Sequence, residues 1–152
     1  MFNNRENNAN PAYIIRLEEV VSLQQSEEVS QEGVKALTDA IREEGVWTTI
    51  IPAEMTSGWV MDGNHRLNAA KYLGLKYVPV VRLSYNDPRV SVLRWDNDQP
   101  YPLDQVEREA QRGLMLPYKT TRHRFIPLLP HVSVPLDALR RHRMLSCGRY
   151  PL

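Results

Sequence analysis

The segment from residue 58 to residue 83 constrains the fold more than any other part of this sequence. A β-prone run at 58–61 leads directly into the polar turn at 62–66, and a helix-forming run at 67–73 follows and ends at Gly74. The run at 77–83 predicts another strand, in which Pro79 indicates an edge position or a bulge. Strand, turn, helix and strand within about 25 residues form a βαβ-like unit. We therefore expect an α/β or α+β domain.

The rest of the chain adds further strands and helices around this unit. Ser30 is a suitable N-cap for a helix that Gly45 would end. A strand is expected at 46–51, and Pro52 is expected to end it. Prolines between residues 116 and 135 argue against a regular helix there. The expected strands lie at 13–17, 46–51 and 90–95, and the expected helices at 31–44, 103–111 and 135–143.

The length and the charge of the chain indicate one domain with an uneven charge distribution. A chain of 152 residues is the usual size for a single hydrophobic core. Lysine and arginine number 19 against 18 acidic residues, so the net charge of +1 gives no reason to invoke nucleic acid or membrane. From Gln111 onward, however, only Asp137 is acidic. We expect a disordered tail at 1–11 and a single domain at 12–152, whose Pro-rich basic C-terminal third faces an anionic group.

The ends of the sequence predict a cytoplasmic protein. The only cysteine, Cys147, excludes an intrachain disulfide and a cysteine metal cluster. The first ten residues lack the basic start and apolar run of a signal peptide. No apolar run approaches the roughly 20 residues of a membrane span. We therefore expect no membrane partner, and the oligomeric state stays open.

The turn Asp62-Gly63-Asn64-His65-Arg66 is the strongest candidate for a functional site. A glycine-containing turn that opens a helix leaves backbone N–H groups free at the positive end of the helix dipole, which favours anions. Arg66 offers a bidentate contact to phosphate, His65 a donor or general acid, and Asp62 a carboxylate for a metal ion or a hydroxyl. The alternative is a structural Asp-Gly turn with an aspartate cap. The context favours the functional interpretation.

Three other features are weaker candidates when each is taken alone. The segment 119–124 combines basic side chains with two threonines, which suits phosphate or carboxylate but also a solvated loop. Glu27 and Glu28 could act as a general base, although adjacent surface glutamates are usually only solvated. Trp95 lies among polar residues and fits a pocket wall or a core position equally well. Together with the turn, the basic segment points to a shared anion site.

The residues from Trp59 to Leu75 resemble the signature of the ParB/sulfiredoxin-like superfamily. In that superfamily a small α/β fold, with a mixed sheet flanked by helices, binds nucleotide phosphates on a Gly-x-x-Arg turn, here Gly63 to Arg66. The Asp-Gly-x-His-Arg form is similar to the free L-serine kinases, which phosphorylate the amino acid with ATP or ADP. Residues 27–28, 90–95 and 113–123 fit that branch. Asn64 replaces a common histidine, and Tyr118 a common proline.

The resemblance implies a role for each candidate residue. Glu27, with Glu28 as the alternative, would accept the proton of the serine hydroxyl; Asp62 would orient that hydroxyl or Mg²⁺, and His65 would assist catalysis. The implied nucleotide- and phosphate-binding residues are Gly63, Asn64, His65, Arg66, Thr120 and Arg122, and the implied substrate-binding residues are Trp95, Lys119, Thr121 and His123. The implied reaction transfers a phosphoryl group from ATP or ADP, with Mg²⁺, to L-serine or a related hydroxy amino acid.

Two other functions deserve comparison with the kinase hypothesis. A non-enzymatic ParB-like regulator would bind nucleotide and DNA through the basic C-terminal third, and the run 140–143 could contact phosphates without sequence preference. No helix-turn-helix is evident after the nucleotide motif, so a nucleic-acid partner is not favoured. Sulfiredoxin-like chemistry is poorly supported because the turn has no cysteine. The kinase hypothesis is therefore preferred.

Overall fold

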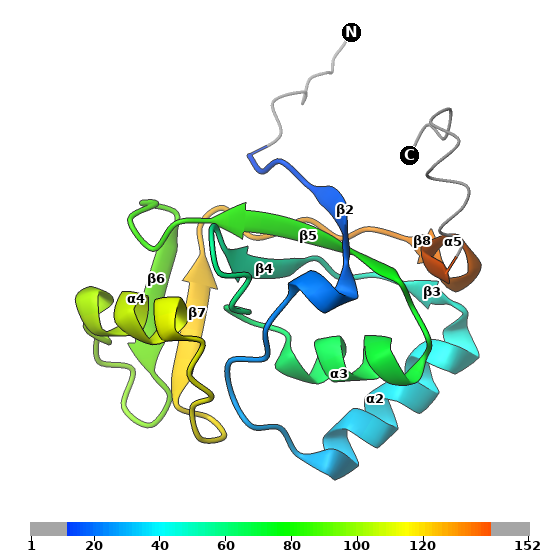
Figure 1. The fold of residues 1–152 in the computed structure, drawn as a ribbon, viewed down its shortest axis with the longest axis horizontal. Coiled ribbons are helices and arrows are strands. Elements are labelled where there is room, and N and C mark those ends of the chain that lie inside the picture. Colours follow the sequence, from blue (N-terminus) through cyan, green and yellow to red (C-terminus); the bar gives the residue numbers. More distant parts are fainter. Residues whose placement is uncertain (1–11, 141–152) are drawn as a thin grey trace, which may run out of the picture.

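The computed structural model describes residues 12–140, and these form a small α/β fold (Figure 1). The expected tail at 1–11, Cys147 and the basic residues after Arg140 lie outside the described residues. In chain order the elements are β2 (Arg16–Glu19), the 3₁₀ helix η1 (Val20–Ser22), α2 (Gln31–Glu44), β3 (Val46–Trp47), β4 (Ile51–Glu54), α3 (Asn64–Tyr72), β5 (Tyr77–Leu83), β6 (Val90–Arg94), α4 (Leu103–Arg112), β7 (Thr121–Phe125), β8 (Val134–Pro135) and α5 (Leu136–Arg140).

A mixed three-stranded sheet forms the centre of the fold, as expected. Its order is β2-β5-β4, with β2 antiparallel and β4 parallel to β5. The edge position expected for Pro79 is wrong, because β5 is the central strand. Pairing with β4 begins at Val80, one residue later, so Pro79 lies where β5 has a strand on one side only.

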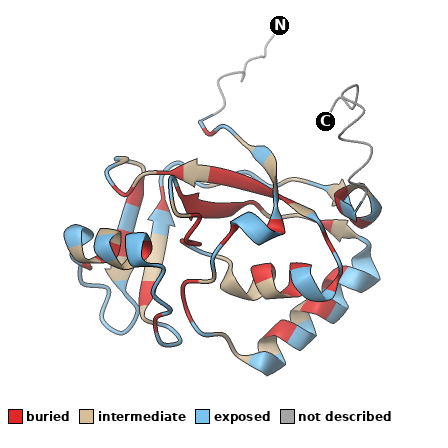
Figure 2. Cartoon of the chain, in the orientation of Figure 1, coloured by how far each residue is buried: buried red, intermediate tan, exposed pale blue. Residues whose placement is uncertain are grey.

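Strands β4 and β5 of the central sheet are buried on both faces, which produces two hydrophobic clusters. Val78 and Val80 of β5 pack with residues of α2 and α3, whereas Val81 and Leu83 pack with residues of β6, β7 and α4. This division follows from strand geometry, since successive side chains point to opposite faces. Figure 2 shows the buried residues concentrated on β4 and β5 and on the inner sides of the helices.

The helix signals in the sequence identify α2 correctly and place the start of α3 too late. Ser30 Oγ accepts the Gly33 N–H at 3.1 Å, and Gly45 ends α2 with a φ of 78°. Helix α3 begins at Asn64, because Gly63 adopts a left-handed conformation with a φ of 99° and acts as the N-cap. The polar turn therefore supplies the first turn of the helix itself.

Several strand predictions need correction. Pro52 does not end a strand but lies within β4, and its carbonyl accepts the Met61 N–H at 2.8 Å. The run expected at 46–51 is split, since β3 pairs with β8 and β4 pairs with β5. Residues 121–125 form β7 and pair antiparallel with β6, so the solvated loop, one of the two interpretations of the segment 119–124, does not hold for this part of it. The alternation of Thr121, His123 and Phe125 with two arginines was the available signal for this strand.

Candidate active site

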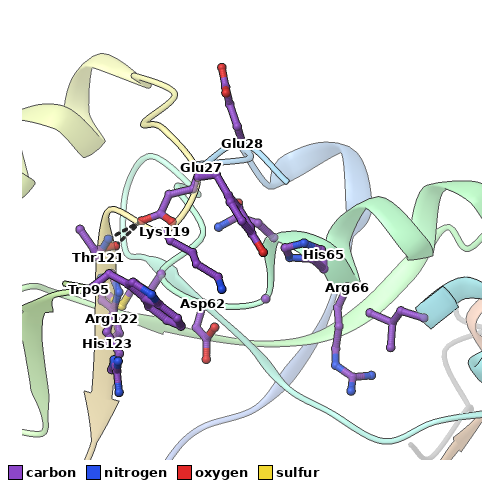
Figure 3. Close-up of a pocket in the computed structure, with 15 residues that line it drawn as sticks. Glu27, Glu28, Asp62, His65, Arg66, Trp95, Lys119, Thr121, Arg122 and His123 are labelled. Atoms are coloured by element: carbon purple, nitrogen blue, oxygen red, sulfur yellow. Dashed lines mark hydrogen bonds between the residues drawn. The ribbon is translucent and has the colours of Figure 1, made fainter. Parts of the chain in front are cut away.

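A pocket of about 480 Å³ lies where the first turn of α3, the loop before α2 and strand β7 converge (Figure 3). It brings together residues that are far apart in the sequence, and every predicted site residue except Thr120 lines it. The lining residues are Glu27, Glu28, Leu37, Met61, Asp62, Gly63, Asn64, His65, Arg66, Trp95, Tyr118, Lys119, Thr121, Arg122 and His123.

The start of α3 presents three free backbone donors at this pocket. The first backbone bond of the helix runs from the Leu67 N–H to the Gly63 carbonyl at 2.8 Å. Within the described residues, the N–H groups of Asn64, His65 and Arg66 make no hydrogen bond. Unpaired N–H groups at the positive end of a helix are a natural site for an anion. These free donors make the start of α3 suitable for the anion that the sequence predicts there, and the site itself stays a prediction.

Glu27 is buried and held in one orientation by β7. Its Oε2 accepts the Thr121 N–H at 2.8 Å and the Thr121 hydroxyl at 2.5 Å. Its Oε1 has only a long contact, 3.4 Å, from the Thr120 N–H, so this oxygen retains capacity to accept a proton. The side chain of Glu28 points away from the pocket centre in Figure 3. The two adjacent glutamates therefore occupy very different environments.

Two side chains of the turn are directed back onto the protein. His65 Nε2 accepts the Ser30 N–H at 3.1 Å, which leaves Nδ1 as the nitrogen able to donate. Burial and the positive charge of Lys119 lower the pKa of His65, so the neutral ring is favoured. The Asn64 amide bonds to Ser26, which leaves the Asn64 backbone N–H for a ligand.

Asp62 and Arg66 place opposite charges beside the free N–H groups. Asp62 is accessible through the pocket but surrounded by protein, and this reduced hydration raises its pKa. The N–H of Gly63 and the charge of Arg66 act in the opposite direction on the same pKa. Arg66 remains available to an anion, since the described residues form no ion pair with its guanidinium within 4.0 Å.

Two cations lie over the ring of Trp95 at the opposite wall of the pocket. The Arg122 guanidinium lies 4.5 Å and the Lys119 ammonium 5.1 Å from the ring centroid. Lys119 has a left-handed backbone with a φ of 59°, which is uncommon for a residue with a side chain. The cation–π contacts leave both side chains charged, and Arg122 Nε also lies 3.7 Å from Asp98 Oδ1 in an exposed ion pair. This wall can therefore bind a second anionic group.

His123 contributes a partly buried, neutral imidazole to the same wall. Its Nε2 lies 2.8 Å from the Tyr85 hydroxyl, and burial lowers the pKa of His123 to about 3. Its Nδ1 is buried and has no hydrogen-bond partner among residues 12–140. If the Tyr85 hydroxyl donates to Nε2, the proton of the neutral His123 ring lies on Nδ1, and this N–H is the one group of the pair without a partner. The opposite direction would leave both the Tyr85 O–H and Nδ1 unpaired, which costs more.

The described residues offer a divalent cation little protein coordination. No group of three histidine, cysteine, aspartate or glutamate side chains gathers as a metal site in that part of the chain. Mg²⁺ commonly uses one or two carboxylates together with substrate phosphates. Asp62, adjacent to the anion site, fits this limited role.

The structure adds pocket residues that sequence reasoning missed and removes one that it included. The hydroxyl of Thr120 donates to the Pro117 carbonyl at 2.6 Å and stabilises the turn before β7. Tyr118, by contrast, lines the pocket with its ring centroid 6.0 Å from that of His65. Leu37 and Met61 line it too, although apolar residues carry no local sign of such a role.

Comparison with solved structures identifies the fold. A free serine kinase in complex with AMP has a TM-score of 0.71 at 15% identity, over 82% of this chain and 93% of that chain. C-terminally truncated SbnI from Staphylococcus aureus has a TM-score of 0.70 at 15% identity, over 89% and 92%. A conserved hypothetical protein from Pyrococcus furiosus has a TM-score of 0.66 at 16% identity, over 82% and 97%. These proteins share the fold of this chain.

Sequence comparison gives the family. A search of curated proteins found no match. Among residues 12–140, no helix has the length and apolar character needed to cross a membrane. The sequence profile described as the ParB N-terminal domain matches residues 3–93, which include the turn at 62–66 and Glu27 but neither Trp95 nor β7. The chain therefore belongs to the ParB N-terminal domain family.

Proposed function

We propose that this protein is a small-molecule kinase that transfers a phosphoryl group from ATP or ADP to the hydroxyl of L-serine or a related hydroxy amino acid. The observation that carries the proposal is the position of Glu27. Its buried carboxylate, with one oxygen held and one nearly free, shares a pocket with the unpaired N–H groups of α3. A proton acceptor beside an anion site is what phosphoryl transfer to an alcohol requires.

The two walls of the pocket suit the two substrates. The nucleotide phosphates would bind the N–H groups of Asn64, His65 and Arg66, with the Arg66 guanidinium adding charge. The carboxylate of the amino acid would bind Lys119 and Arg122, and His123 lines the same wall. The AMP and ADP complexes of the free serine kinases, which share this fold, support the nucleotide assignment.

The transfer needs little covalent chemistry from the protein. Glu27 Oε1 accepts the hydroxyl proton as the substrate oxygen bonds to the terminal phosphorus, and the bond from phosphorus to the bridging oxygen breaks. The products are the O-phosphoamino acid and the shortened nucleotide. Backbone N–H groups and Arg66 stabilise the charge on the transferring group. Asp62 would hold Mg²⁺ carried by the nucleotide, and the ion would neutralise phosphate charge when bound.

The first prediction concerns Glu27. Purified protein with Mg²⁺, L-serine and either ATP or ADP should form O-phosphoserine, detected by mass spectrometry. Glu27→Gln should lower kcat at least about 100-fold, because general-base catalysis typically contributes that much. Circular dichroism should show an unchanged fold, since the amide can still accept from Thr121.

Glu28→Gln tests the alternative base. Because the Glu28 carboxylate points away from the centre of the pocket, this variant should retain most of the activity. A large loss in Glu28→Gln with little loss in Glu27→Gln would reverse the assignment. Absence of product with both nucleotides and every hydroxy amino acid would refute the kinase proposal, and steeply salt-dependent binding to duplex DNA would then favour a non-enzymatic regulator.

A further inference from the structure

Asn64 lies in the proposed anion-binding turn, and both ends of its side-chain amide form hydrogen bonds with the protein. Its Oδ1 accepts the Ser26 N–H at 2.7 Å, and its Nδ2 donates to the Ser26 hydroxyl at 3.1 Å. Ser26 is buried and donates onward to the Val60 carbonyl at 2.5 Å. Both ends of the amide are therefore bonded to one residue, which fixes the orientation of the Asn64 side chain.

The residue that Asn64 holds is the immediate neighbour of Glu27. On the far side of this segment, the Ser26 carbonyl accepts the Leu116 N–H at 2.7 Å, and the Glu28 N–H donates to the Leu116 carbonyl at 2.9 Å. The segment carrying Glu27 is thus fixed between the start of α3 and the chain leading into β7. Of these two attachments, the one to Asn64 joins it directly to the anion site.

We propose that Asn64 is a positioning residue that sets the distance between the base and the transferring phosphoryl group; the inference rests on the proposed kinase function. The backbone N–H of Asn64 belongs to the anion site, and its side chain fixes the segment of Glu27. One residue therefore ties together two groups that must be aligned. Alignment matters because a displacement of about 1 Å can cost about 100-fold in rate.

Asn64→Ala removes the clamp and keeps the backbone donors of α3. We expect kcat to fall about 10- to 100-fold, while the Kd for ADP, measured by calorimetry, changes less than about twofold. Hydrogen exchange of the amides at 26–28 should become faster. Ser26→Ala, which keeps the Ser26 N–H and loses the hydroxyl, should give a smaller change in the same direction.

The clamp acts through Glu27, and a double variant tests this. Added to Glu27→Gln, Asn64→Ala should cause little further loss of kcat, because the base that it positions is already absent. A fully additive loss of kcat in the double variant would overturn the proposal and make Asn64 a general structural residue. A Kd for ADP weakened more than about tenfold, with kcat preserved, would also overturn it and make Asn64 a phosphate ligand.

The exchange measurement keeps the inference separate from the kinase proposal. If the wild-type protein transfers no phosphoryl group, the proposed function fails. The clamp is still supported if Asn64→Ala accelerates exchange at 26–28 and leaves ADP binding intact. Unchanged exchange at these amides overturns it.

Discussion

At the scale of single residues, His123 links the site to the stability of the protein. Burial lowers the pKa of His123 to about 3, whereas the pKa of a histidine in an unfolded chain is about 6.5. Between these values the unfolded state binds one more proton than the folded state. Stability contributed by this histidine is therefore present above about pH 6.5 and is lost progressively as the pH falls towards 3.

This argument predicts a loss of about 2 kcal/mol in the free energy of unfolding from His123 alone between pH 7 and pH 5. His123→Gln should flatten the pH dependence by that amount in urea denaturation. The exposed His131 provides the control, and His131→Gln should leave the slope unchanged. A slope that is the same in His123→Gln and wild type would contradict the prediction.

Residues of the site differ in how far the sequence could predict them. The turn at 62–66 is contiguous, so its chemistry can be inferred from spacing alone. Asn64 and Ser26 are 38 positions apart, and Glu27 and Thr121 are 94 apart. No local pattern encodes such pairs, because they form only when distant segments pack together. The family resemblance placed Glu27 in the site, but its attachment to Thr121 needed the structure.

At the scale of elements, Gly58 illustrates how tightly the turn after β4 is packed. A Cβ on Gly58 would lie 2.3 Å from the carbonyl oxygen of Ser22, and the backbone φ is 76°. Gly45 at the end of α2 has a similar φ of 78° but nothing within 4 Å of the Cβ position. Comparing alanine substitutions at the two glycines therefore separates the cost of backbone strain from the cost of steric overlap.

We predict that Gly45→Ala lowers the free energy of unfolding by about 1 kcal/mol, the cost of a left-handed conformation. Gly58→Ala should cost at least about twice as much, because the backbone of Ser22 must also move. Chemical denaturation of both variants measures the difference. Equal losses of unfolding free energy in the two variants would mean that the turn at Gly58 relaxes around the new Cβ without cost.

The helices were predicted better than the strands. Capping residues such as Ser30 and Gly45 act locally, so they can be recognised in the sequence. Strand β7 is short and basic, and its stability depends on pairing with β6 and on burial of Thr121 and Phe125. Pro52 misled the prediction because β4 tolerates a proline that sequence rules place at a strand end.

At the scale of the whole molecule, the central sheet joins two hydrophobic clusters into one folding unit. Val80 packs into the cluster with α2 and α3, and Val81 into the cluster with α4. Adjacent residues of one strand thus support both sides of the pocket. The apolar run of β5 is visible in the sequence, but which helices cover each face of the strand is not.

We expect Val80→Ala and Val81→Ala each to lower the free energy of unfolding by about 2 kcal/mol, from lost burial and the cavity left behind. Each variant should show a single transition, with the same midpoint by far-ultraviolet circular dichroism and by tryptophan fluorescence. Two transitions, with each variant shifting only one of them, would show that the clusters unfold independently.

The distribution of the three tryptophans gives this molecule an internal optical label. Trp47 and Trp59 are fully buried, one in each cluster, whereas Trp95 is 38% exposed beneath Lys119 and Arg122. A soluble quencher such as acrylamide therefore reaches mainly the indole at the pocket. Emission from the buried pair follows unfolding, and the quenchable part of the spectrum follows occupancy of the site, so both processes can be observed in unmodified protein.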